Sequence, residues 1–357
     1  MQPIRVGVVG LGQIAQIMHI PYLHTMAGFV VNAVCDLSPR LVSGVGDLYH
    51  VPHRYLDARE MIARAPIDAV VICSSFDHAD IALEAIAHGK HMLVEKPLCE
   101  SPALAREIAT AADTADVVVM VAYMKRYDPG FIRWQREIAG LREIRLARVH
   151  DFCHNNQRVI EDAYDLLTGG DIAADVAEAA RARAEARYRE ALGGAPPPHI
   201  VDGYKLALGL GVHDMTILRG SFGDPRAVLF ADVSRDGPPT TVAVLDYGSF
   251  RCTWEIGNTD TKHMDEELGV WARDAIITLR FPSPFIKNIP TELRVTRLVE
   301  TESVTTTTIA SYRESFQNEL AHFHECVTSG RRPLTDAWEG LRDIELLLEI
   351  IQRARPA

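Results

Sequence analysis

The stretch IRVGVVGLGQIA at residues 4–15 decides the fold. Its first six residues are mostly β-branched or apolar, as in a strand that is buried on both faces of a parallel sheet. Gly10 and Gly12 follow at once, and Ala15 completes a GxGxxA pattern where helical sequence begins. A tight turn at Gly10, a close approach of Gly12 to a pyrophosphate and a helix N-terminus facing the phosphates are what a dinucleotide-binding turn requires.

A second predicted strand, VVNAVCD, supports this interpretation. It runs over residues 30–36 and ends in Asp36, roughly 20 residues after the glycine turn, where a ribose 2′-hydroxyl would be bound. The carboxylate of Asp36 would repel the 2′-phosphate of NADP, so we expect NAD as the cofactor. Arg40 is the only nearby residue that favours NADP.

The alternation of helix and strand continues to about residue 121, which predicts an α/β fold with a doubly wound parallel Rossmann sheet. Ligands of such sheets lie beyond the carboxyl ends of the strands. We therefore expect Asp36, Ser74 and Glu95-Lys96-Pro97, which all follow strands, to converge on one edge. The predicted elements are helices at 57–65, 78–88 and 102–114 and strands at 67–73, 91–94 and 117–121.

Beyond Tyr127-Asp128-Pro129 the alternation stops, and a largely antiparallel sheet is predicted instead. We expect a dinucleotide-binding domain over 1–127 and an α+β domain over 128–357 for substrate binding and oligomerisation. Helices are predicted at 315–329 and 336–355. The predicted strands of the second domain are 145–150, 227–233, 241–247, 250–256, 275–281 and 291–298.

A helical insertion is predicted at about 156–204. Apolar or small residues recur every four positions from Ile172 to Leu192, and Gly193-Gly194 with three prolines ends the helix. Two interpretations remain open. The helix is either a solvated element with one packed stripe, or a cover over the substrate pocket or an arm that reaches a neighbouring subunit.

Composition excludes several classes of function. The chain has 357 residues, which favours two domains, and a net charge of −11, which disfavours nucleic acid as a partner. No apolar run approaches the ~20 residues of a membrane helix, and no secretory signal precedes residue 4, so we expect a cytoplasmic protein without membrane contact. The six cysteines show no paired spacing, which predicts reduced buried thiols and no metal site.

Several motifs resemble the glucose–fructose oxidoreductase/inositol dehydrogenase/MocA (Gfo/Idh/MocA) family over nearly the whole chain except the insertion. The resemblance implies an open-faced second sheet with subunit contacts on one face, and hence a homo-oligomer, either a dimer or a tetramer. It also implies that Lys96 reaches both the nicotinamide ribose and the reacting hydroxyl. The motifs are GLGQIA at 10–15, GKHMLVEKP at 89–97, AYMKRYDP at 122–129, GVHD at 211–214 and the closing FPSPF…RRPLTDAWEGL.

The chain departs from this family where D-x-G-x-H is usual, in a helix predicted around 204–218. Gly211 and His213 match, but Gly209 stands at the carboxylate position. Three explanations remain open: His213 works with Lys96 alone, another carboxylate such as Asp214, Asp165 or Asp171 takes the role, or catalysis is lost. Lys205 lies at the i, i+4, i+8 spacing with Gly209 and His213, which favours a common helix face.

We therefore expect an NAD-dependent dehydrogenase or ketoreductase that acts on a secondary hydroxyl or ketone of a sugar, glycoside, cyclitol or aminosugar-like compound. Lys96 and His213 are the predicted catalytic residues, which handle the hydroxyl proton. The alternative is a dinucleotide-binding sensor or scaffold with little turnover, favoured by Gly209. Predicted cofactor contacts are Gly10, Gly12, Gln13, Ile14, Asp36, Ser74, Ser75, His78, Glu95, Lys96, Pro97 and Arg126, and predicted substrate contacts are Lys96, Tyr123, Lys125, His154, Lys205 and His213.

Overall fold

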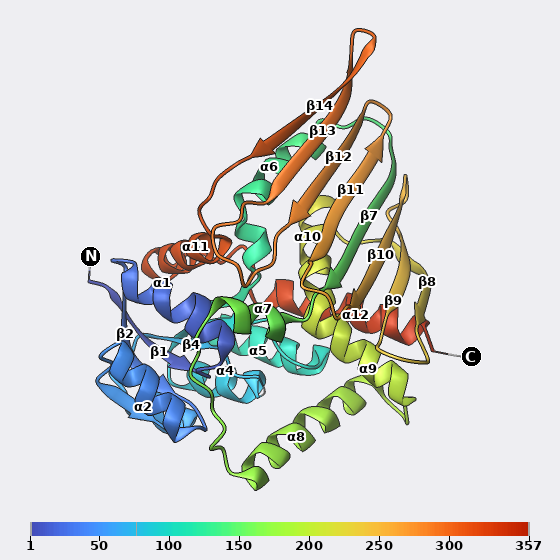
Figure 1. The fold of residues 1–357 in the computed structure, drawn as a ribbon. Coiled ribbons are helices and arrows are strands. Elements are labelled where there is room, and N and C mark those ends of the chain that lie inside the picture. The colour runs from blue at the N-terminus through green and yellow to red at the C-terminus, as the bar shows by residue number, and fades with distance from the viewer. Residues whose placement is uncertain (1, 76, 356–357) are drawn as a thin grey trace. The chain divides into compact units, whose positions relative to one another are not determined.

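The computed structural model describes residues 2–75 and 77–355, which form two compact units (Figure 1). The first unit comprises Met1–Tyr123, Asp165–Ala191 and Phe316–Ile344, and the second comprises the remaining segments. This division differs from the two consecutive domains expected from the sequence. Residues 165–191 and 316–344, which were assigned to the second domain, pack with the first unit.

The first unit contains a parallel sheet with the strand order β3-β2-β1-β4-β5-β6, which is the order of a dinucleotide-binding Rossmann fold. Val9 at the end of β1 pairs with Cys35 on one side and Ile72 on the other. Gly10, Asp36 and Cys73 therefore follow at the same carboxyl edge of the sheet. The strands are β1 (Ile4–Val9), β2 (Phe29–Cys35), β3 (His53–Tyr55), β4 (Ala69–Ile72), β5 (His91–Glu95) and β6 (Val119–Ala122).

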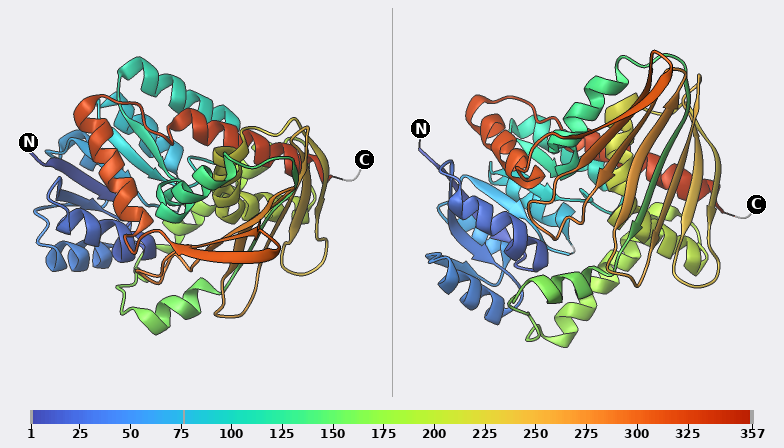
Figure 2. Two further views of the ribbon diagram at one scale, coloured as in Figure 1. Left: turned by 90° about the horizontal axis from the view of Figure 1, so that it is seen from above. Right: turned by 45° about the horizontal axis from the view of Figure 1, so that its top comes forward.

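Continuous burial explains why these short runs are strands. All four residues of β4 and of β6 are buried, as are four of the five residues of β5, because helices cover both faces of the sheet (Figure 2). The structure thus confirms the predicted Rossmann sheet. The helices of this unit are η1 (Ala15–His19), α1 (Ile20–Thr25), α2 (Pro39–Leu48), α3 (Ala58–Arg64), α4 (His78–Ala87), α5 (Pro102–Ala115), most of α8 (Ala174–Leu192) and of α11 (Ser315–Ser329), and the first part of α12 (Ala337–Arg353).

The second unit is built on a sheet of eight strands in the order β14-β13-β12-β11-β7-β10-β9-β8. All neighbours are antiparallel except β7 and β10, which run parallel. The largely antiparallel sheet predicted from the sequence is therefore confirmed. The strands are β7 (Ile144–Cys153), β8 (Ala227–Val233), β9 (Thr241–Asp246), β10 (Arg251–Asn258), β11 (Asp265–Ala272), β12 (Ala275–Phe281), β13 (Glu292–Val299) and β14 (Glu302–Ile309).

One face of this sheet is covered and the other is open. Residues of β12 alternate between buried and exposed, and α6 and α10 contact the covered face (Figure 1). This alternation is typical of an antiparallel sheet with one solvated face. The helices of the unit are η2 (Met124–Tyr127), α6 (Pro129–Ile138), α7 (Asn156–Ala163), α9 (Pro198–Leu206), η3 (Ala207–Gly211) and α10 (Val212–Phe222).

The prediction missed two strands of this sheet for different reasons. The strand β11 opens with the charged residues DEE, yet Glu266 within it is fully buried. The edge strand β14 reads ESVTTTTI and is exposed along most of its length, so it shows no alternation of apolar and polar residues. Neither strand therefore carries the period-two apolar pattern on which the prediction depended.

The helix expected around 204–218 is not one continuous α-helix. The segment η3 (Ala207–Gly211) is a π-helix that separates α9 from α10. A π turn contains one residue more than an α turn, so the i, i+4, i+8 alignment expected for Lys205, Gly209 and His213 is not maintained. The ammonium of Lys205 lies 3.7 Å from a carboxylate oxygen of Asp202 on its own helix.

Candidate active site

A cavity of about 790 Å³ lies at the carboxyl edge of β1, β2 and β4 in the first unit. It brings together five residues that the sequence nominated for cofactor binding, namely Gly10, Gly12, Asp36, Ser74 and Ser75. Because all five come from loops that follow parallel strands, the cavity occupies the place where nucleotide cofactors bind in this type of sheet.

The glycine turn is shaped for close approach of another group. Gly10 has a φ of +85°, and a Cβ on it would lie 2.4 Å from the backbone nitrogen of Ser74. A Cβ built on Gly12 would meet no atom of the described residues within 4 Å, so this part of the turn opens into the cavity. Gln13 is exposed and Ile14 half-buried at the start of the helical turn that follows. These features fit a dinucleotide pyrophosphate.

Asp36 links the glycine turn to the next loop. One of its carboxylate oxygens accepts a hydrogen bond from the backbone N–H of Leu11 at 2.7 Å. The other oxygen accepts from the backbone N–H of Ser38 at 2.9 Å. The carboxylate is thus fixed at the rim of the cavity, where it can accept a hydrogen bond from a ribose hydroxyl.

Glu95 anchors the end of β5. Its buried carboxylate accepts a hydrogen bond from the backbone N–H of Lys96 at 3.0 Å and lies 2.7 Å from Nε2 of His19. Burial raises the pKa of Glu95, but the hydrogen bond and charge of His19, with the charge of Lys96, outweigh it and lower the pKa overall. An ionised carboxylate therefore accepts the hydrogen bond from the backbone of the half-buried Lys96.

His78 joins two loops at this edge of the sheet. Its ring nitrogens lie 2.8 Å from the carbonyl oxygen of Pro97 and 2.6 Å from that of Ser74. Both nitrogens thus contact backbone rather than the cavity. The structure indicates that His78 positions the loops after β4 and β5, which is a different role from the cofactor contact expected of it.

In the second unit, the half-buried His213 lies in the first turn of α10. The next residue, Asp214, is fully buried, and its carboxylate accepts a hydrogen bond from Nε1 of Trp254 at 3.2 Å. A Cβ built on Gly209 would meet no atom of the described residues within 4 Å outside its own helix. The first carbon of a side chain at position 209 would therefore meet no steric obstacle among these residues.

Lys125, expected to contact substrate, lies in a buried cluster of charges in the second unit. Its ammonium donates to the carboxylate of Glu266, and the carboxylates of Asp151, Asp214 and Glu266 lie within 4.8 Å of one another. Carboxylates at this spacing can hold a metal ion, but here the ammonium of Lys125 supplies a positive charge. Lys125 is 3% exposed, so its ammonium balances the charge of buried carboxylates within the protein.

The cluster changes the pKa values of its members. Burial lowers the pKa of Lys125, but Glu266, Asp151 and Asp214 outweigh this effect and raise it overall, so Lys125 remains a cation. Burial, reinforced by Glu266, raises the pKa of Asp214 well above its ordinary value. Burial likewise raises the pKa of Glu266, against the opposing charge of Lys125. The cluster therefore favours proton retention on Asp214 and Glu266.

Asp214→Asn is expected to stabilise the folded protein by about 1–3 kcal/mol at about pH 8, and by much less at about pH 5. An acid whose pKa is raised by folding contributes stability below its unfolded pKa, and this stability is lost as the pH rises through the folded pKa. Asparagine loses no proton and can still accept from Trp254. Urea denaturation at both pH values measures the difference, with the exposed Asp232→Asn as control. Equal effects at both pH values would contradict the expectation.

Three further residues that were predicted to contact cofactor or substrate are buried. Tyr123 is fully buried at the end of the first unit's main segment. In the second unit, the buried guanidinium of Arg126 donates to the carbonyl oxygen of Thr216 on α10 at 3.1 Å. Nε2 of the buried His154 lies 2.8 Å from Oγ of Ser283, and burial lowers the pKa of His154. These side chains have protein partners, and none of them lines the cofactor cavity.

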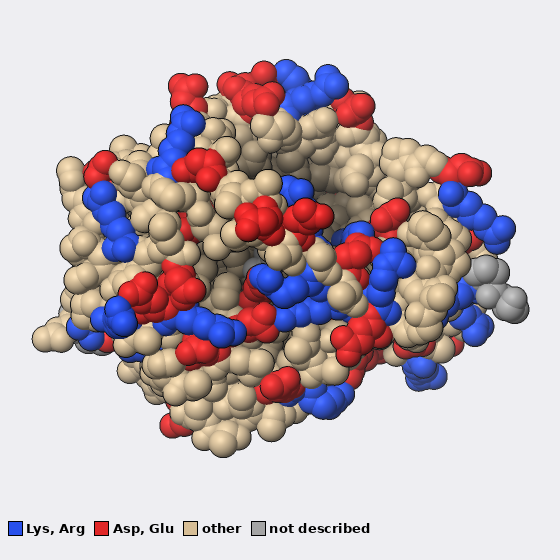
Figure 3. All heavy atoms as spheres, turned by 90° about the horizontal axis from the view of Figure 1, so that it is seen from below, with Lys and Arg blue, Asp and Glu red and all other residues tan. Residues whose placement is uncertain are grey.

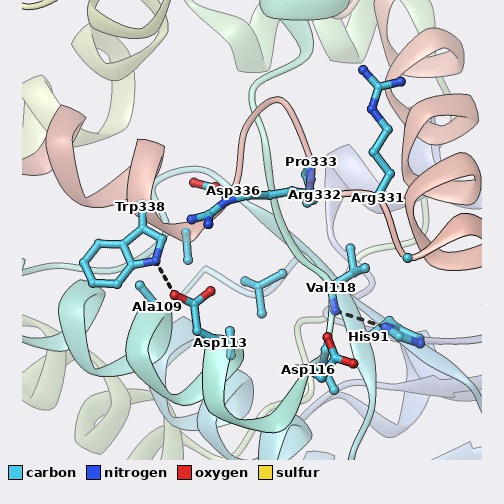
Figure 4. A pocket seen from close by; sticks show the side chains of 15 residues that line it. His91, Ala109, Asp113, Asp116, Val118, Arg331, Arg332, Pro333, Asp336 and Trp338 are labelled. Carbon is cyan, nitrogen blue, oxygen red and sulfur yellow. Dashed lines mark hydrogen bonds and ion pairs between the residues drawn. The ribbon is translucent and has the colours of Figure 1, made fainter.

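A smaller pocket of about 370 Å³ lies at the opposite edge of the parallel sheet (Figure 4). His91 and Val119, which begin β5 and β6, help to line it. Nδ1 of His91 accepts a hydrogen bond from the backbone N–H of Val118, and Nε1 of Trp338 donates to Asp113. Because it lies at the amino ends of the strands, this pocket is not where a cofactor of this fold binds.

The insertion supplies part of the cofactor cavity, which the sequence did not indicate. Ala180, Ala184 and Leu192 of the expected apolar stripe are buried, whereas Val176 is exposed. Most of the helix packs in the first unit, where it lines the cofactor cavity. The cavity residues that it contributes are Gly169, Ile172, Ala177, Ala180, Arg181 and Arg183.

Fold and cavity together define an NAD(P)-binding Rossmann domain, and comparison with known families agrees. Residues 4–123 match the family described as an oxidoreductase family with an NAD-binding Rossmann fold, Gfo/Idh/MocA. The match covers the dinucleotide-binding part of the chain, and it agrees with the resemblance noted in its motifs.

Curated relatives include inositol dehydrogenases. The chain is 33% identical over 163 residues to inositol 2-dehydrogenase of Paracoccus denitrificans, which covers 44% of this chain and 48% of that protein. It is 29% identical over 128 residues to myo-inositol 2-dehydrogenase of Thermotoga maritima, which covers 36% and 38%. The chain thus matches about half the length, or less, of these relatives.

Solved structures resemble the chain over its full length. A 3-ketoreductase from Actinomadura kijaniata, solved with NADP, has a TM-score of 0.75 at 17% identity, covering 99% of this chain and 98% of that one. An oxidoreductase from Agrobacterium radiobacter, solved with NAD⁺, L-tartaric acid and magnesium, has a TM-score of 0.71 at 18% identity, covering 98% and 96%. At these identities the likeness establishes the fold of both units.

No helix among the residues that the structure describes is long and apolar enough to cross a membrane. All six cysteines are buried and unbridged, as expected from their spacing. Burial raises the pKa of Cys35 and Cys99 to about 12. These thiols are therefore poor nucleophiles.

Proposed function

We propose that the chain is an NAD-dependent dehydrogenase or ketoreductase that transfers hydride between nicotinamide and a secondary hydroxyl or ketone. The proposed substrates are sugars, glycosides, cyclitols or aminosugar-like compounds. The curated relatives named as inositol dehydrogenases and the solved 3-ketoreductase support this class of substrate.

The cavity at the carboxyl edge of the parallel sheet carries the proposal. It combines a glycine turn open to a pyrophosphate with a fixed Asp36 carboxylate for a ribose. Lys96 is not among the residues that line this cavity, but it follows β5, the strand next to β4, at the same edge of the sheet. Hydroxyl oxidation requires a binding site for the nicotinamide cofactor and a base that accepts the hydroxyl proton. Lys96 is the candidate base.

In this mechanism each residue has a defined task. The nicotinamide, when bound, supplies the hydride acceptor or donor. Lys96 accepts the hydroxyl proton during oxidation and returns it during reduction, while Glu95 and His19 hold the backbone of Lys96 in place. His213 passes the proton onward. Asp36 receives the 2′-hydroxyl of the adenosine ribose, which favours NAD over NADP.

Steady-state assays with NAD⁺ and NADP⁺ against a panel of inositols, hexoses and glycosides test the proposal. We expect formation of reduced cofactor with at least one member of the panel and with NAD⁺ preferred. Heat protection by each dinucleotide, measured in parallel, reports binding without turnover. Failure of every dinucleotide to bind would refute the proposal.

A dinucleotide-binding sensor is the second candidate, because Gly209 replaces the carboxylate that the family resemblance implies. A sensor would be protected by NADH yet would oxidise no member of the panel. In that case Gly209→Asp, whose Cβ would meet no atom of the described residues within 4 Å outside its own helix, is expected to create turnover. Turnover by the unaltered protein, lost when Lys96 is replaced, would exclude the sensor.

We further propose that the open face of the second sheet binds another copy of the chain. Leu146, Trp271 and Ile276 lie in register across three neighbouring strands of this face. Leu146 is 36% exposed and Ile276 is 43% exposed, which forms an apolar row on the surface. The covered face of the sheet offers no such row, since α6 and α10 contact it.

Ile276→Lys is expected to weaken self-association by about tenfold or more, since it places a charge within this apolar row. Light scattering coupled to size-exclusion chromatography measures the oligomeric state over a range of concentrations. Arg280→Lys, on the same strand and with its charge retained, is the control. An unaltered protein that stays monomeric at high concentration would contradict the proposal.

A further inference from the structure

The insertion places a carboxylate at the N-terminus of α2. This helix follows β2, the strand that ends just before Asp36. Asp171 accepts a hydrogen bond from the hydroxyl of Ser38 through one oxygen. Its other oxygen accepts from the backbone N–H of Arg40 at 2.9 Å. The hydrogen bond from Ser38 lowers the pKa of Asp171, so this carboxylate is ionised at neutral pH.

Ser38 connects Asp171 directly to Asp36. Its backbone N–H donates to Asp36, while its hydroxyl donates to Asp171 and accepts from the backbone N–H of Leu41. Two carboxylates therefore lie on either side of one turn. The N–H groups of Arg40 and Leu41, which a helix N-terminus offers to an anion, already have partners within the chain.

The segment around Asp171 is docked closely on α2. A Cβ on Gly169 would lie 2.8 Å from a methyl carbon of Leu41 and 3.1 Å from Cβ of Ser38, so glycine favours this close approach. The side chain of Gln16 donates to the carbonyl oxygen of Leu167 and accepts from its N–H, both at 3.0 Å. Asp171 is therefore positioned by contacts on more than one side.

Ion pairs hold the following helix, α8, against the same unit. Arg183 donates to Asp77 at 2.8 Å, and Arg187 donates to Asp80 at 2.7 Å. On the face seen from below, Lys and Arg side chains gather in the middle with Asp and Glu side chains around them (Figure 3). The insertion thus forms a wall of the cofactor cavity, to which Gly169 and Ile172, close to Asp171 in the chain, both contribute.

The two nicotinamide cofactors differ only at the adenosine 2′-position, where NADP carries a phosphate. A 2′-phosphate beside Asp36 would need the donors and positive dipole of the turn that begins α2. We propose that Asp171 is a specificity-determining residue, which excludes NADP because its carboxylate already occupies the anion position at the N-terminus of α2. This inference rests on the proposed function and extends it from Asp36 to the insertion.

The test compares NADH and NADPH binding by the full-length protein, measured by isothermal titration calorimetry. For Asp171→Ala we expect the affinity for NADPH relative to NADH to rise about tenfold, close to the upper end of the effect of a solvent-exposed charge contact. Asp171→Asn removes the charge but keeps one acceptor oxygen, which can still bind the backbone N–H of Arg40, so it should show a smaller rise. Adding Arg40→Ala to Asp171→Ala should remove the gain.

Two controls show whether a change in the NADPH-to-NADH affinity ratio is due to Asp171 itself. Asp175→Ala removes an exposed carboxylate four residues later and should leave the ratio unchanged. Melting temperatures with and without NADH show whether each variant is folded. If the unaltered protein binds NADH but neither Asp171 variant changes the ratio, this inference fails while the proposed function stands. If the unaltered protein binds neither dinucleotide, both fail.

Discussion

Lys96→Met is expected to lower kcat by about 10³-fold, within the range for loss of a general acid–base group. Methionine fills a similar volume but can neither accept nor return a proton. Glu95 remains bonded to the backbone N–H at position 96, so the end of β5 should retain its conformation. Reduced-cofactor formation under saturating substrate measures the effect, and the affinity for NADH should change by less than about tenfold.

A matched lysine at the other end of the same strand provides the control. Lys90 precedes β5, and its ammonium donates to the carbonyl oxygen of Ile67 at 2.9 Å. Lys90→Met should leave kcat unchanged. If Lys96→Met turns over at the normal rate while NADH still binds, then Lys96 does not transfer the proton.

His213→Ala is expected to lower kcat by at least about 10²-fold, the lower end of general acid–base effects. Gly209 stands where the family resemblance implies a carboxylate that would help in proton transfer. The imidazole of His213 would therefore carry out this transfer without that carboxylate. His263, exposed in the same unit, is the control, and His263→Ala should have no effect. A normal rate for His213→Ala would remove His213 from the mechanism.

The double variant distinguishes a shared task from two independent ones. If Lys96 and His213 handle the same proton, the variant with both changes should be no slower than the Lys96 variant alone, because residues that act as a unit are not additive. If the two losses multiply instead, the residues contribute to separate steps. Single-turnover measurements at saturating NAD⁺ report the chemical step directly.

Most of the Rossmann sheet could be predicted because most of its strands are marked by an apolar run and turn residues within a short segment of the sequence. The run at residues 4–9 is continuously apolar except for Arg5, and its glycine turn follows immediately. Asp36 was placed correctly at the end of β2 because the spacing between turn and acid is constrained by one strand–helix–strand unit. The strand β14 lacks such a local signal, since its threonines face solvent on both sides.

The candidate site was harder to predict, since burial decides what a charged residue does. Lys125 follows the last parallel strand and was expected to contact substrate, yet Glu266 on a distant strand binds it inside the second unit. Nothing in the sequence DEELGVWA indicates that its second residue is buried. Such a pair depends on the register of β11 against β7, which local patterns do not encode.

The position of Asp171 could not be predicted from the sequence either. This residue was considered as a replacement for the missing catalytic carboxylate, because it lies in the insertion before His213. Its carboxylate instead binds Ser38 and Arg40 at the cofactor end of the first unit. The only sequence signal was the pair Gly169-Gly170 just before it, which permits the close contact with α2.

The interleaved path of the chain limits how the protein can be dissected. Each unit is assembled from three separate segments, so the backbone passes from one to the other five times. A recombinant fragment that stops at Tyr123 would keep the glycine turn but lose Ile172, Arg183 and the rest of one cavity wall. Low dinucleotide affinity in such a truncation would reflect the missing wall, so binding studies require the intact polypeptide.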